Sequence, residues 1–395
     1  MAPSQTAPAA TPASVLRLDR LGVLIALIGL AGALSPFALF RATRIGQGEP
    51  RSMLEVLQPS ESGLLVGLVC AGLLFALLRF GTLARLVVGL IVLAALFVLV
   101  GRAADFLTPP ENTFARVSPG TGFWVLSFAM TLMAADALAR MRLKPWPRVG
   151  ILALVAVAFG LLLWSGTLNN VSVLREYGVN APKFWAEGRT HILLAFGSLI
   201  AATLAGVPLG ILCYRRPKLR AAVLNVLNII QTIPSIALFG LLIAPLAWVA
   251  ATVPGARAIG ISGIGAAPAL VALFAYSLLP VVANTVVGLL NVPEAANDAA
   301  RGMGMTDRQR LFAVELPLAF PVILTGIRIV LVQNIGLATI AALIGGGGWG
   351  VFVFLGISQT AMDLVLLGAV PTVALAFAAA IVLDAAVEMV ATGKR

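Results

Sequence analysis

The sequence predicts an all-α, polytopic transmembrane bundle of about ten spans, and composition and the grouping of apolar residues carry that prediction. Of its 395 residues, 60% are hydrophobic and only 11% are charged, with a mean hydropathy of +1.02. A soluble domain carries roughly 25% charged residues, so this composition cannot cover a water-facing surface. The apolar residues also gather in runs comparable to the roughly 20 helical residues that cross a bilayer. A soluble enzyme is therefore excluded.

Five apolar runs precede a polar stretch, and five follow it. Because lipid offers the backbone no hydrogen-bond partner, each run is expected to be a helix. The runs cover residues 21–40, 63–80, 86–101, 121–138 and 149–166 in the first half, and 192–214, 221–250, 266–290, 321–344 and 364–389 in the second. The last five spans are expected to form a bundle of their own.

The polar segments between these runs divide the chain. Residues 1–16 are small and polar and are predicted to be a disordered cytoplasmic tail. Residues 17–166 then form a five-helix membrane region, 167–190 a periplasmic connecting loop, and 191–390 the second bundle. The first run also fits a secretory signal cleaved after Ala31-Gly32-Ala33. Since the apolar residues continue to Phe40, we expect an uncleaved helix.

The net charge of +11 comes from scattered Lys and Arg residues that form no binding stripe, so no nucleic-acid partner is expected. In a membrane protein, Lys and Arg are retained in cytoplasmic loops. With a cytoplasmic amino terminus, 17 of the 27 fall on the cytoplasmic side and 9 on the other, with Arg328 inside a span. Both termini are therefore predicted to be cytoplasmic, although three arginines in the first outer loop weaken the inference for the first helix.

Metal and disulfide chemistry are not expected. The two cysteines, Cys70 and Cys213, lie far apart in apolar stretches, and His191 is the single histidine. Such a set offers neither the ligands of a metal site nor a disulfide framework. We predict no catalytic residue, no metal site and no cofactor bound by this chain.

The loop between the eighth and ninth spans reads as two short helices. Pro293 and Glu294 suit a first helical turn, because proline lacks the N–H that would be unpaired there and the acid faces the positive end of the dipole. Gly302 and Gly304 end this helix. Thr306 and Gln309 have the spacing of a capping box for a second helix, which is expected to stop at Leu316-Pro317 as the chain turns into the ninth span.

These residues resemble the integral-membrane permeases of bacterial ABC importers, the binding-protein-dependent transport inner-membrane components. The loop signature of that family is E-A-A, three residues, Gly, nine residues and I-x-L-P. Asp298, Ala299, Ala300, Gly304 and then Val314-Glu315-Leu316-Pro317 reproduce this spacing, with Asp and Val as the departures. We call residues 291–320 the EAA segment; the resemblance implies that it is a coupling loop that docks on an ATPase subunit.

Other stretches resemble the glycine betaine, carnitine and choline branch of the family. They include GVPLGILCYRRPKL at 206–219, NIIQTIPSIALFG at 228–240 and AYSLLPVVANTVVGL at 275–289. The resemblance covers about residues 190–390 and implies a type I permease core of the bacterial inner membrane. It implies three partners besides membrane lipid: ABC ATPase subunits, a second core from the same or a different chain, and a periplasmic substrate-binding protein. The role of the first five spans, as regulator, scaffold or lipid-facing bulk, stays open.

No phosphate-binding G-x-x-x-x-G-K-[ST] motif occurs in the sequence, so ATP and Mg²⁺ would be used by the partner ATPase. In that case this chain is a non-catalytic subunit, and energy arrives through contact with the EAA segment. Asp298 fits two roles there, as a partner for a basic residue of the ATPase or as a cap of its own helix. The alternatives are a permease for an amino acid or a sulfonate, an ion-coupled secondary transporter, and an intramembrane enzyme, which the single histidine disfavours.

Polar residues inside the spans are candidates for the translocation path. Such side chains usually face a protein interior or water, although hydrogen bonds between helices explain them about as well. The candidates are Gln231, Thr232, Pro234, Ser235, Asn284, Gln333 and Asn334. Arg328 would repel a cationic substrate and is expected to reach headgroups instead. Asp384 and Glu388 share a face of the last span, where solvation or pairing is expected.

Overall fold

The computed structural model describes residues 19–392 except 44–45, 79, 109–110 and 113. The predicted tail at 1–16 lies outside the described residues, as do five basic residues of the charge count: Arg17, Arg44, Arg79, Lys394 and Arg395. Among the described residues, nine helices are long and apolar enough to cross a membrane. A further apolar helix, α1 (Arg20–Leu34), has 15 residues. The predicted polytopic helical bundle is confirmed, with one short first helix.

Contacts divide the chain into two units, and α5 (Pro145–Trp164) is shared between them. The N-terminal unit comprises Met1–Leu143 and Phe159–Ser172, and the C-terminal unit comprises Lys144–Ala158 and Val173–Arg395. Besides α1 and part of α5, the N-terminal unit contains α2 (Pro59–Leu77), α3 (Thr82–Leu107) and α4 (Thr121–Met141), with strands β1 (Ala38–Arg41), β2 (Glu49–Arg51) and β3 (Arg116–Pro119).

Small residues let the helices of the N-terminal unit pack closely. A Cβ added at Gly22 of α1 would lie 1.9 Å from the carbonyl oxygen of Ala76 in α2, and one at Gly32 would lie 2.9 Å from the backbone nitrogen of Leu126 in α4. Close approach of backbones through glycine is the usual device of helices in lipid, where no hydrophobic force drives them together.

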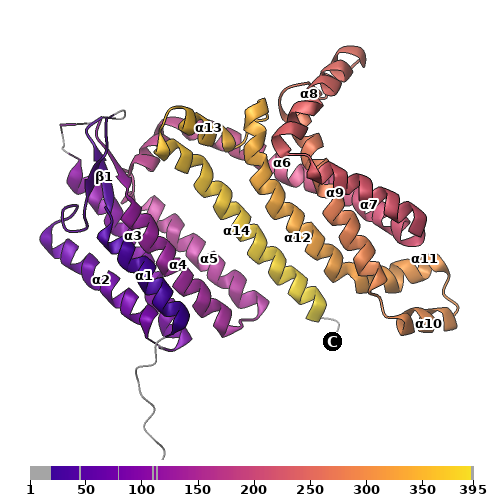
Figure 1. Ribbon diagram of the computed structural model, residues 1–395, viewed down its shortest axis with the longest axis horizontal. Coiled ribbons are helices and arrows are strands. Elements are labelled where there is room, and N and C mark those ends of the chain that lie inside the picture. Colours follow the sequence, from indigo (N-terminus) through magenta and orange to yellow (C-terminus); the bar gives the residue numbers. More distant parts are fainter. Residues whose placement is uncertain (1–18, 44–45, 79, 109–110, 113, 393–395) are drawn as a thin grey trace, which may run out of the picture. The chain divides into compact units, whose positions relative to one another are not determined.

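A small antiparallel sheet, in the order β2-β1-β3, was not predicted. The first apolar run, expected to be helical over 21–40, ends as a helix at Leu34, and its last residues form β1. Ser35 precedes Pro36, and the residue before a proline is driven out of the helical region. Figure 1 shows the sheet at the end of the unit opposite the start of α1.

The described part of the C-terminal unit contains helices and connecting turns but no strand. Its helices are α6 (Ser172–Arg215), α7 (Pro217–Thr232), α8 (Ser235–Thr252), α9 (Ala266–Leu290), α10 (Glu294–Gly302), α11 (Asp307–Arg310), a π-helical turn (Leu311–Glu315), α12 (Leu316–Ile340), a 3₁₀ turn (Ala341–Ile344), α13 (Gly350–Ser358) and α14 (Met362–Thr392). In Figure 1, α10, α11 and the end of α14 lie at one end of this unit, and α13 lies at the other.

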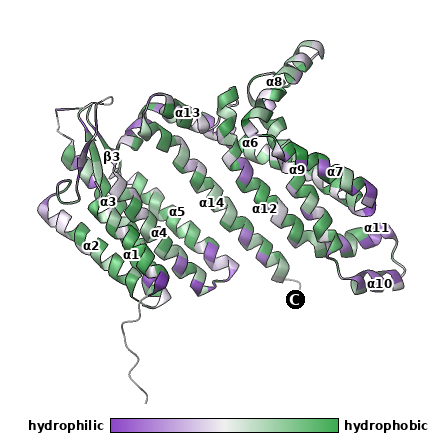
Figure 2. Cartoon of the chain, viewed as in Figure 1, coloured by the Kyte–Doolittle hydropathy of each residue, from purple (hydrophilic) through white to green (hydrophobic). Residues whose placement is uncertain are grey.

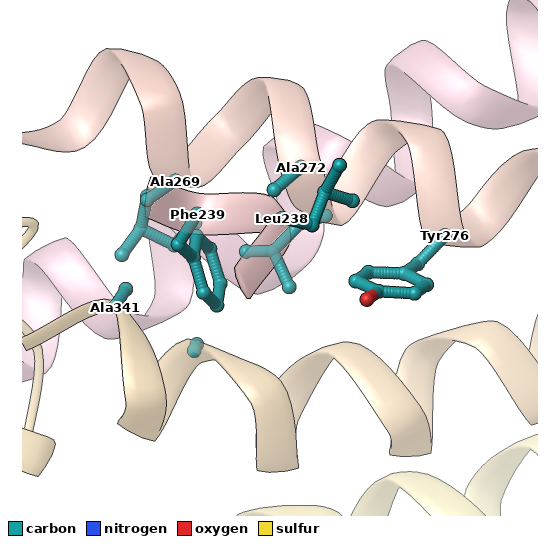
Figure 3. Packing of buried hydrophobic residues seen from close by; sticks show 9 residues of the cluster. Leu238, Phe239, Ala269, Ala272, Tyr276 and Ala341 are labelled. Atoms are coloured by element: carbon teal, nitrogen blue, oxygen red, sulfur yellow. The ribbon is translucent and has the colours of Figure 1, made fainter. Parts of the chain in front are cut away.

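Several apolar clusters lie within the C-terminal unit, and two of them join its long helices. Leu238 and Phe239 of α8 pack beside Ala269 and Ala272 of α9, together with Ala341 (Figure 3). A second cluster joins α6, α9 and α12 to apolar residues of α14. The helices are hydrophobic along most of their length, whereas polar residues concentrate on α10 (Figure 2).

Two predicted boundaries in this unit are wrong. Residues 167–190 were expected to be a loop, but α6 begins at Ser172 and runs without a break to Arg215. Its polar first half is amphipathic: Val173, Tyr177 and Phe184 pack against a buried cluster around Trp349 and α13. The run at 221–250 was expected to be one span, but α7 and α8 are separate helices on either side of Ile233 and Pro234.

Candidate functional site

The first helix of the EAA segment ends in a left-handed glycine turn. Gly304 has φ +75°, and two backbone bonds close the turn: Met305 N–H donates to the Ala300 carbonyl at 3.1 Å, and Gly304 N–H donates to the Arg301 carbonyl at 2.9 Å. This pair of bonds is a Schellman motif, which favours glycine at the left-handed position. The glycine of the signature is thus needed for a fixed bend after α10.

The second helix begins with the predicted capping box. The Thr306 N–H donates to Gln309 Oε1 at 2.8 Å, and the Gln309 N–H donates to Thr306 Oγ1 at 3.3 Å. Arg215, at the end of α6, donates to the Asp307 carbonyl at 3.2 Å. The reciprocal bonds satisfy two N–H groups that the helix start would leave unpaired, and the arginine fastens this start to a membrane-spanning helix.

The second helix does not stop at Leu316-Pro317, contrary to the prediction. It continues through the π-helical turn Leu311–Glu315 into α12, so that Asp307–Ile344 is one unbroken helical segment. Pro317 lies in the first turn of α12, where its missing N–H is tolerated because the wider π turn comes directly before it. No loop therefore separates α11 from α12.

A buried acid in the π turn was not predicted. Glu315 is 2% exposed, and its Oε1 accepts a hydrogen bond from Arg310 Nε at 2.9 Å. Arg310 also pairs with Asp307 at 3.1 Å. The signature treats this position as variable, so only the spacing of Arg310 and Glu315 across one turn offered a signal. These pairs stiffen the junction between α11 and α12.

The signature residues of the EAA segment differ in exposure. Asp298 has a side chain 63% exposed and lies 3.6 Å from Arg301 on its own helix; it does not cap α10, which begins at Glu294. Ala299 is exposed and Ala300 is buried. Val314, Leu316 and Pro317 are half-buried. A small-residue surface of α10 therefore faces outward, and the end of the signature packs into the core.

The polar residues considered for the path do not all share one environment. Gln231, Thr232, Pro234 and Ser235 lie together at the break between α7 and α8, where Gln231 Nε2 donates to the Tyr276 carbonyl of α9 at 2.7 Å. Thr232 Oγ1 donates to the Ile229 carbonyl within its own helix.

Asn334 and Asn284 are bonded inside the protein. The amide of Asn334 is fully buried and donates at 2.9 Å to Ser198 of α6 and to Ser277 of α9. Asn284 donates to the Pro280 carbonyl of its own helix and lies against Gly326. Gln333 is half-buried. Gln231 and Asn334 therefore form hydrogen bonds between helices. This was the alternative to a role in the translocation path.

Four charged residues of α5, α12 and α14 form ion pairs in the structure. Arg328 Nη1 lies 2.7 Å from Asp384 Oδ1, and Arg148 Nη1 lies 3.4 Å from Asp384 Oδ2 and 3.0 Å from Glu388 Oε2. The sequence placed the two acids on one face, but it could not identify their partners, which come from distant helices. In the described part of the chain, no group of three or more His, Cys, Asp or Glu side chains could hold a metal ion.

The fold and the EAA segment define a polytopic transport permease, and comparison with known proteins agrees. Residues 206–395 match the model of the binding-protein-dependent transport system inner membrane component, and residues 19–174 match that of the N-terminal domain of the ABC transporter permease YehY. The chain belongs to the family of ABC importer permeases.

Several relatives carry names from osmoprotectant transport. The osmoprotectant import permease OsmW of Salmonella typhimurium is 45% identical over 45% of this chain and 78% of its own length. The choline permease OpuBB of Bacillus subtilis is 38% identical over 47% and 78%, and the carnitine permease OpuCB of Listeria monocytogenes is 37% identical over 52% and 87%. A structure of the MetNI methionine ABC transporter aligns with 53% of this chain and 95% of its own, at 24% identity and a TM-score of 0.45.

Proposed function

We propose that this chain is the permease of an ATP-driven importer for a quaternary ammonium osmoprotectant such as glycine betaine, choline or carnitine. The observation that carries the proposal is the bend at Gly304 between α10 and α11, which has the signature spacing. We call α10, α11 and this bend the elbow. The names of the relatives support the substrate class. A permease for an amino acid or a sulfonate is the second candidate.

Docking of an ATPase at 298–317 is supported by the shape and the continuity of the elbow. Ala295, Ala299 and Gly302 give α10 an exposed, low-relief surface, and Met303 beside it is 70% exposed. Such a helix fits a groove on a partner, with Met303 as an adaptable apolar contact. Because α11 runs into α12 without a loop, a groove that shifts the elbow also tilts a membrane-spanning helix.

The remaining partners follow from this arrangement. The EAA segment and the end of α14 lie at the same end of the C-terminal unit (Figure 1). This placement supports an inner-membrane protein in which the ATPase site and the carboxyl terminus are on the same, cytoplasmic, side. A periplasmic binding protein would deliver substrate at the other end, and a second core, from the same or a different chain, would complete the path. The break at Thr232, Pro234 and Ser235 is our candidate for a bend lining that path, because the chain leaves helical geometry there, between α7 and the apolar helix α8.

Transport in proteoliposomes tests the function. The chain is reconstituted with its ATPase and binding protein, and uptake of labelled glycine betaine, choline, carnitine, methionine and taurine is measured with and without ATP. ATP-dependent uptake of the first three compounds is expected. Uptake of methionine or taurine alone would favour the second candidate. Uptake by this chain alone, driven by an ion gradient, would show an ion-coupled secondary transporter.

A matched pair of glycines tests the elbow. Gly304→Ala puts a Cβ at a left-handed position, which costs roughly 1–2 kcal/mol, whereas Gly67→Ala, in α2 and outside the EAA segment, changes an ordinary helical position with nothing within 4 Å of the added atom. If the bend must be kept for docking, Gly304→Ala weakens ATPase binding about 5–30-fold and Gly67→Ala leaves it unchanged. Equal binding by both variants, measured by titration of the detergent-solubilised permease, would contradict a docking role for the bend.

Steric blocking gives a second test of docking. Ala299 is exposed on α10, and Ala299→Arg places a long side chain where we expect the ATPase groove. The control is Ala258→Arg, the same substitution at an exposed residue after α8. Loss of copurified ATPase in the first variant, with retention in the second, is expected. Retention in both would place the docking surface elsewhere.

A further inference from the structure

Two charged residues face each other inside helices that are long enough to span the membrane. Arg328 lies in the middle of α12 and Asp384 in the second half of α14, and their side chains are 2.7 Å apart. Ionisable residues at such positions are costly in lipid, usually pair with one another, and mark functional elements. A pair of hydrophobic residues would stabilise the fold equally well. Stability alone therefore does not explain why these two positions are charged.

Asp384 is shared with a third helix. Arg148, in the first turn of α5, lies 3.4 Å from Asp384 and 3.0 Å from Glu388, one turn further along α14. We call Arg148, Arg328, Asp384 and Glu388 the C-terminal ion cluster; its two cations balance its two anions. None of the described residues of α5 is buried. Ion pairs thus join the first turn of α5 to α14 within the C-terminal unit.

The position of Arg328 connects the cluster to the EAA segment. Leu316 is the first residue of α12, and Arg328 lies about 18 Å further along the helix axis, at a rise of 1.5 Å per residue. The helix is unbroken from Asp307. Ile327, next to Arg328, and Leu383, next to Asp384, both pack against the apolar cluster of α6, α9 and α12. Rotation or sliding of α12 would therefore move Arg328 relative to Asp384.

The cluster is also accessible enough to rearrange. The four side chains are 35–43% exposed. Partly exposed ion pairs contribute little stability because water or headgroups replace the lost partner, so these contacts can be broken and remade in a cycle.

We propose that Asp384 is a positioning residue for α12: by holding Arg328 and Arg148 together, it ties α5 to the helix that continues into the EAA segment. Residues 145–158 of α5, which belong to the C-terminal unit, thereby move together with α12 and α14. The inference rests on the proposed docking of an ATPase at the EAA segment.

The test measures coupling in the full complex. Permease, ATPase and binding protein are reconstituted in proteoliposomes, and glycine betaine uptake and ATP hydrolysis are recorded together. Asp384→Asn is expected to lower uptake per ATP at least five-fold while the ATPase still copurifies. Arg328→Gln and Arg148→Gln each remove one of the two arginines that pair with Asp384. Each variant is expected to lower uptake per ATP at least two-fold. Asp384→Glu, which keeps both pairs, should retain more than half of the wild-type ratio.

The control removes a carboxylate elsewhere. Glu61→Gln on α2 removes an acid that lies 4.0 Å from Arg102, and this variant should keep the wild-type uptake per ATP. Thermal melting of each purified variant establishes that it is folded; if Asp384→Asn does not fold, Arg148→Gln and Arg328→Gln decide. Wild-type uptake per ATP in folded Asp384→Asn, or in both arginine variants, would overturn the inference. Failure of the ATPase to copurify with the wild-type permease would instead refute the proposed function.

Discussion

Each unit contains a cluster of two arginines and two acids, and the clusters differ in burial. In the N-terminal ion cluster, Arg85 Nη1 lies 2.6 Å from Asp19 and 3.3 Å from Asp136, and Arg140 pairs with both acids at 2.9 Å. The side chain of Arg85 is 2% exposed and that of Asp19 is 7% exposed. In the C-terminal ion cluster every side chain is at least 35% exposed.

The difference in burial separates a fixed joint from a reversible one. Removing one partner of a buried pair leaves an uncompensated charge in a low dielectric, which is strongly destabilising. Removing one partner of an exposed pair has little effect, because solvent takes its place. The N-terminal ion cluster therefore fixes the ends of α1, α3 and α4 in one register, whereas the C-terminal ion cluster can change partners during a transport cycle.

The largest expected effect comes from the buried arginine. Arg85→Met leaves Asp19 and Asp136 without their central partner and should destabilise the N-terminal unit by about 3–5 kcal/mol, read as a fall in thermal midpoint in detergent. Arg102→Met, on the same helix but 60% exposed, is the control. A loss no larger than that of the control would erase the distinction between the two clusters.

A second substitution tests whether the N-terminal unit is as rigid as its ion cluster indicates. In Gly22→Ala the new Cβ would lie 1.9 Å from a backbone oxygen of α2, so α1 must shift, at a cost of about 1–3 kcal/mol. Gly67→Ala on α2 has nothing within 4 Å and should be neutral or slightly stabilising. If both variants melt together, α1 is free to move and the unit is not rigid.

The pH dependence of stability sharpens the same comparison. Burial alone would raise the pKa of Asp19, but hydrogen bonds and attraction from Arg85 and Arg140 outweigh it and hold that pKa below 3.8. A lowered pKa means that the stabilisation is complete above the unfolded value and is lost as the pH falls through the folded value. Melting of the wild type and of Asp19→Asn should thus differ most at neutral pH and converge in acid below pH 3.8. A constant difference across that range would contradict this linkage.

The smallest effect is expected in the C-terminal ion cluster. Arg148→Gln removes a partly exposed pair and should change stability by only about 0–1 kcal/mol, even though we expect it to alter coupling. A melting shift as large as that of Arg85→Met would mean that the C-terminal ion cluster is structural, and it would remove the argument for a reversible joint.

Local patterns predicted local structure well. The capping box at Thr306 and the helix end at Gly302 and Gly304 were read correctly, because each depends on residues within one or two turns. The extension of α6 was missed, since its polar residues resemble a loop until Val173 and Phe184 are seen to pack on α13. The sheet was missed because strand pairing joins β1 with β3, far along the chain.

The sequence by itself determined the class of protein, the number of apolar segments to within one, and the family spacing of the EAA segment, since hydropathy and capping act along the chain. Only the tertiary structure decided which charges pair: Arg85 with Asp19, Arg328 with Asp384, and Arg148 with both acids of α14. It also placed the amide of Asn334 between α6 and α9. The physical reason is that a buried charge or amide takes whichever partner the packed helices bring within about 3 Å, and that partner can lie anywhere in the sequence.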